Sequence, residues 1–246
     1  MENIEKYFEQ ITNGTVLDVA TGTGSFLSRI SEYLVSPDKL IGVDSKAEAI
    51  KRACDIHNAK PFEFRCMDAN KLEFDDNSFD VVTVSNSLHH FENPTVVILE
   101  MIRVLKNNGL LVIYEMVRDK QNEKQMTHVL MHDFWGRIDS QLGVYHNNTF
   151  TREQIEKMLQ ENNSLALICY EEELEDNNES ADNAQQYQEE LQMLENVMLS
   201  YVDKAKKNKL NDLESIEEAA KSLMTRLKNV GFEYATECIY ILRKNN

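Results

Sequence analysis

Positive charge is scarce in this chain of 246 residues. Lysine and arginine total 26 against 42 aspartates and glutamates, which gives a formal net charge of −16 at pH 7. Proteins that hold nucleic acid by its phosphates need clustered lysine and arginine, and a strongly acidic chain repels a polyanion. The composition therefore disfavours a nucleic-acid partner.

Cysteine is also rare. The four cysteines stand at positions 54, 66, 169 and 238, and no two of them form a Cys-x-x-Cys pair. This spacing argues against a disulfide framework and against a cysteine zinc site. The simplest expectation is four buried thiols in a reducing compartment.

Long apolar runs and linkers are missing as well. No stretch of 18 or more apolar residues occurs, so the sequence predicts no membrane span, and the first ten residues are amphipathic rather than a signal peptide. Only 3 prolines and 8 glycines are present, without a linker rich in them. We expect a cytoplasmic protein with one sizeable domain, or one domain with an appendage.

The first half alternates short apolar runs with amphipathic stretches. The runs are rich in Val, Ile and Leu, as is typical of strands buried on both faces, and they cover residues 15–20, 39–43, 62–66, 79–84 and 109–114. Helices are predicted between them at 26–34, 46–57 and 95–106, the last with a start signal at Asn93-Pro94. The alternation predicts βαβ units around a parallel sheet.

After residue 114 the pattern changes to longer helices. The predicted elements are helices at 120–142 and 152–160, a strand at 165–170, helices at 183–207 and 212–229, and a last strand at 236–242. Residues 171–195 carry ten acidic side chains and no Lys or Arg, which is typical of a solvated segment. We interpret 171–230 as an acidic helical insertion into a domain formed by 1–170 and 231–246.

The strongest motif is the segment 16–26, VLDVATGTGSF, in which a buried strand enters a glycine turn and then a helix. Gly22 and Gly24 let the backbone approach a ligand closely, beside the free N–H groups of the helix N-terminus. Leu27 stands where the dinucleotide fingerprint has its third glycine, so a pyrophosphate is disfavoured. Asp18 repels a phosphate but accepts from an ammonium, which favours a ligand with an amino-acid moiety.

Two further acids follow neighbouring strands. Asp44 ends the second strand, where a carboxylate can hold both hydroxyls of a ribose. Asp68 follows the third strand and can accept from an exocyclic amine such as that of adenine. The strand ends thus offer acceptors for an ammonium, a ribose and an adenine.

Five blocks in order carry a family resemblance: VLDVATGTGSF (16–26), IGVD (41–44), CMDA (66–69), LEFDDNSFDVVTVSNSLHHF (72–91) and RVLKNNGLLVIYE (103–115). Over roughly residues 8–116 the chain resembles the class I S-adenosylmethionine-dependent methyltransferases. It is especially similar to the small-molecule type that includes the ubiquinone/menaquinone C-methyltransferases. It departs at Ala20, where many relatives carry glycine, and at 107–109, where Pro-Gly-Gly is commoner than Asn-Asn-Gly.

The resemblance implies a Rossmann-like doubly wound α/β fold, with a mostly parallel seven-stranded sheet, an antiparallel last strand and a helical insertion. It implies methyl transfer to a small molecule, with S-adenosylmethionine as cofactor and S-adenosylhomocysteine as product. Gly22 and Gly24 would line the methionine part, and Ser85 and Asn86 would face the sulfonium. The full predicted cofactor set is Asp18, Ala20, Thr21, Gly22, Thr23, Gly24, Asp44, Ser45, Asp68, Ala69, Ser85 and Asn86.

Methyl transfer from a sulfonium is an in-line displacement that depends mainly on positioning and desolvation. A general base is needed only where the acceptor must lose a proton. His89 and His90 follow the fourth strand, and Glu115 ends the fifth, so each of them can reach the same rim. His89 is a candidate base, although a structural role for this His pair is the alternative.

The predicted helix 120–142 carries two stripes. Its expected core face is Met126, Leu130, Phe134 and Ile138, and its second stripe is His128, His132, Trp135 and Asp139. The second stripe is either an ordinary surface or a lid over the substrate, with His132 or His128 as base. Tyr145 and His146 in the next loop are weaker candidates. We predict no metal in the site, with ligation by His128, His132 and an acid as the alternative.

Other activities stay open at this point. Methylation of a protein side chain would suit a basic substrate drawn by the net charge of −16. A non-catalytic subunit that only binds S-adenosylmethionine would keep the three acids but have a plugged acceptor pocket. The sequence does not indicate the acceptor atom or the oligomeric state.

Overall fold

The computed structural model describes residues 6–8, 14–173 and 181–246. The chain divides into two compact units. The first comprises Met1–Glu115, Glu153–Glu173 and Cys238–Asn246, and the second comprises Met116–Arg152 and Leu174–Glu237. Each unit has its own hydrophobic core.

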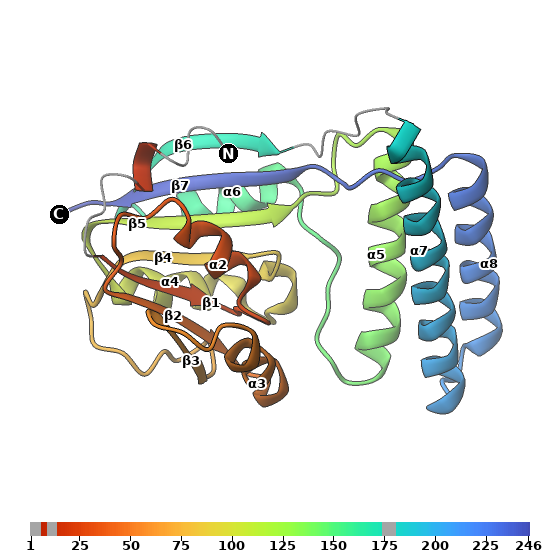
Figure 1. Ribbon diagram of the computed structural model, residues 1–246, viewed down its shortest axis with the longest axis horizontal. Helices are drawn as coiled ribbons and strands as arrows, with labels where there is room; N and C mark the ends of the chain where they lie inside the picture. Colours follow the sequence, from red (N-terminus) through yellow and green to blue (C-terminus); the bar gives the residue numbers. More distant parts are fainter. Residues whose placement is uncertain (1–5, 9–13, 174–180) are drawn as a thin grey trace. The chain divides into compact units, whose positions relative to one another are not determined.

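The first unit is built on a seven-stranded sheet with the strand order β3-β2-β1-β4-β5-β7-β6 (Figure 1). The strands are β1 (Thr15–Val19), β2 (Lys39–Asp44), β3 (Phe62–Cys66), β4 (Phe79–Ser85), β5 (Leu105–Met116), β6 (Leu165–Glu173) and β7 (Glu237–Lys244). Strands β1 to β5 pair in parallel, whereas β7 lies between β5 and β6 and runs against them. The predicted fold class, a Rossmann-like sheet with an antiparallel last strand, is confirmed.

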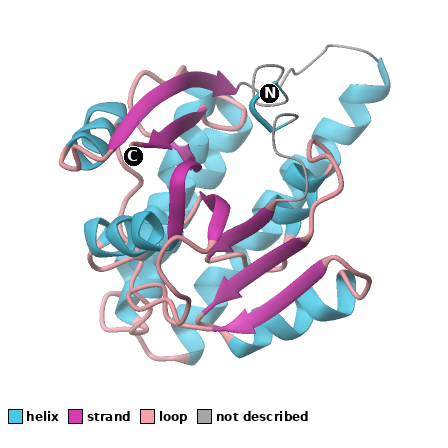
Figure 2. Cartoon of the chain, turned by 90° about the vertical axis from the view of Figure 1, so that its left-hand side faces the viewer, coloured by secondary structure: helices cyan, strands magenta, loops and turns pink. Residues whose placement is uncertain are grey.

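Helices cover both faces of this sheet (Figures 1 and 2). They are α2 (Ser25–Ser31), α3 (Ala47–Ile56), α4 (Pro94–Val104) and α6 (Arg152–Gln160), with a short 3-10 turn η1 (Leu88–His90) after β4. The central strands are therefore buried from both sides, and Val16, Val81 and Val112 have no exposed surface. This burial explains why these strands are nearly continuous apolar runs in the sequence.

Helix α4 begins as predicted but ends early. The side chain of Asn93 accepts a hydrogen bond from the Val96 amide, and Pro94 occupies the first turn. The helix ends at Val104 because the chain passes directly into β5 at Leu105. The sequence placed the start of this strand at residue 109, since the polar residues 106–108 interrupt the apolar pattern.

The second unit contains three long helices that lie side by side (Figure 1): α5 (Glu123–Gln141), α7 (Ala181–Lys207) and α8 (Leu213–Asn229). Met131, Phe134 and Ile138 of α5 share one apolar core with side chains of α7 and α8. The sequence had assigned α5 to the sheet domain, whereas its contacts group it with the inserted helices. The acidic stretch 171–195 lies partly outside the described residues.

The predicted core stripe of α5 is wrong at Leu130, which is 37% exposed. The buried residues of α5 include Thr127, Met131, Phe134 and Ile138 on one side of the helix, and also Gln125, Val129 and Gly136. Steps of four residues drift by about 40° each around a helix of 3.6 residues per turn. The residues Thr127, Met131, Phe134 and Ile138 follow steps of four, three and four and so stay on one side of the helix, whereas the predicted set has steps of four only.

Two expectations from composition have clear outcomes. Only Cys238 is buried, while Cys54 and Cys66 are exposed and Cys169 is intermediate, so the expectation of four buried thiols is wrong for three of them. Across the ranges that the structure describes, no helix is long and apolar enough to cross a membrane.

Candidate functional site

The carboxyl ends of β1 to β4 meet at one edge of the sheet. Val19 is in register with Val43 of β2 and with Val84 of β4, and Asp44 is in register with Cys66 of β3. The residues that follow these strands therefore share one edge, where open α/β sheets bind their ligands. The fold brings the predicted cofactor residues from four separate segments to this edge.

The glycine turn connects β1 to α2 through left-handed backbone conformations. Ala20, Gly22 and Gly24 have φ values of 56°, 56° and 80°. A Cβ atom on Gly24 would lie 2.8 Å from the Phe64 ring, so packing requires a glycine there. A Cβ atom on Gly22 would meet nothing within 4 Å, so Gly22 faces open space beside the turn. Left-handed backbone at Ala20 also accounts for the glycine that many relatives are expected to carry at this position.

Asp18 fastens this turn to the sheet. Its carboxylate is buried and accepts from the Thr21 hydroxyl at 2.6 Å and from the Thr83 hydroxyl at 2.7 Å. Burial raises the pKa of Asp18 to about 6, although the two hydrogen bonds act in the opposite direction. Asp18 therefore holds β1, the turn and β4 together, and its role as acceptor for an ammonium stays a prediction.

Thr83 is a site residue that the sequence reasoning missed. It is buried on β4 and supplies the second hydrogen bond to Asp18. A hydroxyl among the valines at positions 81, 82 and 84 was the available signal, because buried polar groups need a partner.

Asp44 and Asp68 have freer carboxylates. Asp44, half-buried at the end of β2, accepts from the Gly22 amide at 3.0 Å and from the Lys46 amide at 2.8 Å. Asp68 is exposed, and its Oδ1 accepts from the amide and the side chain of Asn70, each at 2.9 Å. Asp44 thus ties the second strand end to the glycine turn, and both acids keep acceptor capacity for a ligand.

Ser85 and Asn86 lie at the end of β4, both half-buried. The Asn86 amide donates to the Tyr114 carbonyl at 2.7 Å, and the Ser85 carbonyl accepts from the Ser87 hydroxyl at 2.7 Å. These bonds fix the backbone of the segment that follows β4. The other predicted members, Ala20, Thr21, Thr23, Ser45 and Ala69, lie in the turns at the same sheet edge.

His89 and Glu115 form a buried pair at the neighbouring strand end. Glu115 accepts from the backbone amides of Ser87 and Leu88, at 3.0 and 3.1 Å, and is hydrogen-bonded to Nδ1 of His89. Both side chains are buried, at 0% and 2% exposure. A carboxylate at Nδ1 keeps that nitrogen protonated and so directs the lone pair of a neutral imidazole to Nε2. Glu115 thus orients His89 through the contact at Nδ1.

His128 has a structural partner in the second unit. Its Nδ1 accepts from the Ala235 amide at 3.0 Å, and its ring packs edge-on against Phe232 and Tyr234. Burial lowers the pKa of His128 to about 4, so the ring is neutral at pH 7. Because the lone pair of the neutral ring already accepts this hydrogen bond, His128 lacks the free lone pair that a general base needs.

His132 contacts His146. The two Nε2 atoms of His132 and His146 are 3.3 Å apart. The alternative metal set of His128, His132 and an acid is not assembled, because the Nδ1 lone pair of His128 accepts a hydrogen bond from the Ala235 amide. Trp135 and Asp139 of the same stripe contact Tyr201 of α7. The Trp135 ring packs against the Tyr201 ring, and Asp139 accepts from the Tyr201 hydroxyl.

The residues at the sheet edge fit S-adenosylmethionine. Gly22 leaves open space where any other residue would project a side chain. Asp44 and Asp68 present carboxylates at adjacent strand ends, and these suit ribose hydroxyls and an adenine amine. The site combines a backbone cradle with acceptors and matches the donor groups of this cofactor.

Comparison with known sequences gives one family. A model of the family described as a methyltransferase domain matches residues 12–196. The chain is 36% identical over 120 residues to a demethylmenaquinone methyltransferase of Porphyromonas gingivalis, covering 46% of this chain and 48% of that protein. It is 33% identical over 107 residues to a ubiquinone/menaquinone biosynthesis C-methyltransferase of Citrifermentans bemidjiense, covering 42% and 46%. The match thus spans about half the length of these relatives.

Solved structures share the fold at lower identity. One is a phosphoethanolamine N-methyltransferase 2 of Haemonchus contortus, solved with phosphomonomethylethanolamine and S-adenosylhomocysteine. It superposes with a TM-score of 0.57 at 16% identity and covers 99% of this chain and 52% of that chain. At this identity the likeness concerns the fold alone.

Proposed function

Because the chain belongs to the class I S-adenosylmethionine-dependent methyltransferases, with S-adenosylmethionine as its cofactor, we propose that it methylates a small-molecule acceptor. The observation that carries this proposal is the sheet edge. There the Gly22 turn leaves open space and is tied by its amide to Asp44, the acid of the second strand end.

The chain's residues divide the binding between them. When bound, S-adenosylmethionine supplies an electrophilic methyl group on a sulfonium. Asp44 accepts from the ribose hydroxyls, and Asp68 accepts from the adenine amine. Ser85 and Asn86, fixed by their backbone bonds after β4, lie at the methyl end of the site. Positioning and exclusion of water then provide much of the rate enhancement.

His89 is the general base in this proposal. Its Nδ1 is hydrogen-bonded to Glu115, which fixes the orientation of the ring for proton transfer from an acidic acceptor group. The name of one bacterial relative states methyl transfer to demethylmenaquinone, and the name of the other states C-methylation in ubiquinone/menaquinone biosynthesis. A ring hydroxyl that loses its proton makes both its oxygen and the adjacent ring carbons nucleophilic. We therefore propose a hydroxylated ring compound as the acceptor, with His89 taking the hydroxyl proton.

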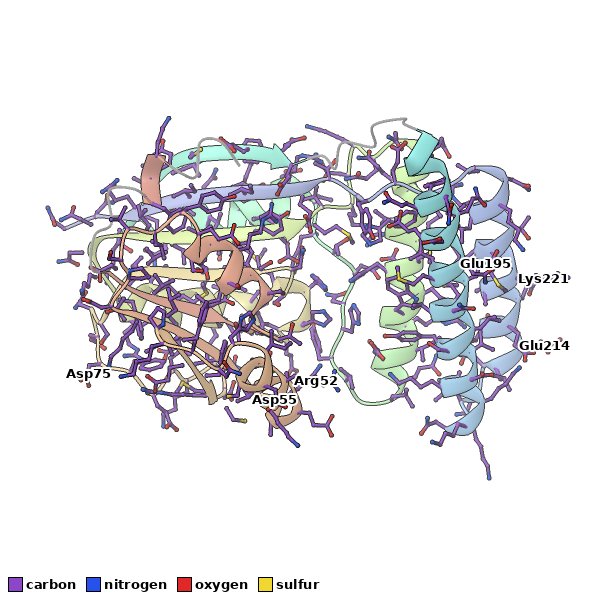
Figure 3. All side chains as sticks on the ribbon, viewed as in Figure 1. Arg52, Asp55, Asp75, Glu195, Glu214 and Lys221 are labelled. Atoms are coloured by element: carbon purple, nitrogen blue, oxygen red, sulfur yellow. The ribbon has the colours of Figure 1, made fainter. Side chains whose placement is uncertain are left out.

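The first experiment is calorimetric titration with S-adenosylmethionine and S-adenosylhomocysteine. Asp44→Ala should weaken both affinities tenfold or more, about 1.4 kcal/mol. Asp75→Ala is the matched control, because Asp75 is an exposed acid in the loop before β4 (Figure 3). Folded wild-type protein that binds neither compound would refute the proposal. With binding established, release of S-adenosylhomocysteine in the presence of hydroxylated ring compounds tests the acceptor class.

A further inference from the structure

We propose that His132 and His146 form a binding site for a divalent transition-metal ion such as zinc. His132 lies on α5, and His146 lies in the loop that follows this helix. Their Nε2 atoms are 3.3 Å apart, with the two rings inclined by 72°. Both residues belong to the second unit, and neither belongs to the cofactor set at the sheet edge.

The separation of the two nitrogens suits a tetrahedral ion. Zinc binds imidazole nitrogen at about 2.0–2.1 Å, and two such ligands at the tetrahedral angle stand about 3.3–3.4 Å apart. A direct hydrogen bond between ring nitrogens is also compatible with the distance, but it is longer than the usual 2.9–3.0 Å. Imidazole ligands select zinc, copper, nickel or iron over magnesium and calcium, which prefer oxygen.

Asp139 holds one of the two ligands in place. Its Oδ2 is hydrogen-bonded to Nδ1 of His146 at 3.2 Å, while its Oδ1 accepts from Lys204 at 2.7 Å. This carboxylate keeps the His146 proton on Nδ1, so the lone pair of a neutral ring is on Nε2, facing His132. A carboxylate that orients a ligating histidine is the usual second contact of a metal site.

Gly136 makes room for the His146 ring. It lies in the interior of α5, where glycine costs about 1 kcal/mol relative to alanine. A Cβ atom at this position would lie 3.2 Å from Cδ2 of His146, closer than nearly all such contacts. The Ser140 hydroxyl donates to the His146 carbonyl at 2.8 Å and fixes the loop from the other side. The close approach at Gly136 and the Ser140 hydrogen bond thus fix the position of the His146 imidazole.

The two histidines leave further coordination positions for water or a small ligand. An ion with two protein ligands is held less tightly than the ion of a closed structural site with four. The expected behaviour is therefore reversible binding of one zinc ion per chain, which competes with a chelator of moderate affinity.

The test is titration of the full chain with zinc chloride, without S-adenosylmethionine, against such a chelator. We expect one equivalent to bind to wild type and the affinity to fall at least tenfold in His132→Gln and in His146→Gln. His128→Gln is the matched control on the same helix. It should bind zinc like wild type, because the Nδ1 atom of His128 accepts a hydrogen bond from the Ala235 amide and is not a ligand of the proposed site. Asp139→Asn should weaken binding by about 10- to 100-fold.

Cobalt(II) absorption separates this site from the exposed thiols Cys54 and Cys66. We expect d–d bands without a thiolate charge-transfer band, and loss of those bands in His146→Gln. Circular dichroism melts show that each variant is folded, and calorimetry with S-adenosylhomocysteine shows that the cofactor site is unchanged. Absence of binding by wild type, or undiminished binding by both histidine variants, would overturn the proposal. Either result would leave the methyltransferase proposal standing.

Discussion

Replacement of Asp18 by asparagine tests the most heavily buried acid of the site. The pKa of Asp18 is raised from 3.8 to about 6, mainly by burial. In the unfolded chain this group ionises at its ordinary pKa, so the folded state binds the proton more tightly. Its contribution to the free energy of unfolding is therefore fully present below about pH 4 and is lost as the pH rises through 6. Asp18→Asn removes this dependence.

The magnitude follows from the two pKa values. Between pH 5.5 and 8 the wild type loses about 0.8 kcal/mol of unfolding free energy through Asp18. We expect the stability of Asp18→Asn relative to wild type to rise by this amount over the same range. An amide nitrogen cannot accept from the hydroxyl of Thr21 or Thr83, so a constant offset is also expected. The pH dependence, rather than the offset, is the test.

Urea unfolding of both proteins across this pH range measures the difference directly. Asp75→Asn is the control, since Asp75 is exposed (Figure 3), and its difference from wild type should stay flat. A flat or falling difference for Asp18→Asn would refute the raised pKa. The same urea series with saturating S-adenosylmethionine tests whether the ligand's ammonium group contacts Asp18. An ammonium that contacts Asp18 would favour its carboxylate form and reduce the pH dependence, whereas an ammonium bound elsewhere would leave it unchanged.

Two further predictions concern the other buried groups. In Glu115→Gln the side-chain amide donates to Nδ1 of His89, which moves the imidazole proton to Nε2. We expect the turnover number to fall about 100-fold or more, while the affinity for S-adenosylmethionine stays within threefold of wild type. Steady-state kinetics across pH measure the turnover number, and an unchanged value would contradict this role of Glu115. Burial lowers the pKa of His128 to about 4, so its contribution to the free energy of unfolding is present above pH 6.5 and is lost as the pH falls towards 4. In the same urea series, the free energy of unfolding of His128→Gln should rise by about 1.4 kcal/mol relative to wild type between pH 8 and pH 5.5. A difference that stays constant with pH would contradict the burial argument.

The sheet and the cofactor edge were predictable because their signals are local. Short apolar runs mark strands that are buried on both faces, and the glycine turn and the acids after each strand stand within a few residues of those runs. Parallel pairing then places every strand end at one edge, whatever the remainder of the chain does. Local patterns in the sequence were therefore sufficient to predict the fold class. They also predicted that the candidate cofactor residues lie at one edge of the sheet.

The roles of single polar side chains depended on contacts between distant segments. Thr83 reaches Asp18 across 65 positions of sequence, Glu115 reaches His89 across 26, and the Ala235 amide takes the lone pair of His128 across 107. The sequence leaves no periodic or motif signal that identifies the partner in such a pair, because a hydrogen bond requires only two groups at the right distance and angle. The tertiary structure alone decided that His128 is a structural acceptor, that Glu115 orients His89 and that His132 faces His146.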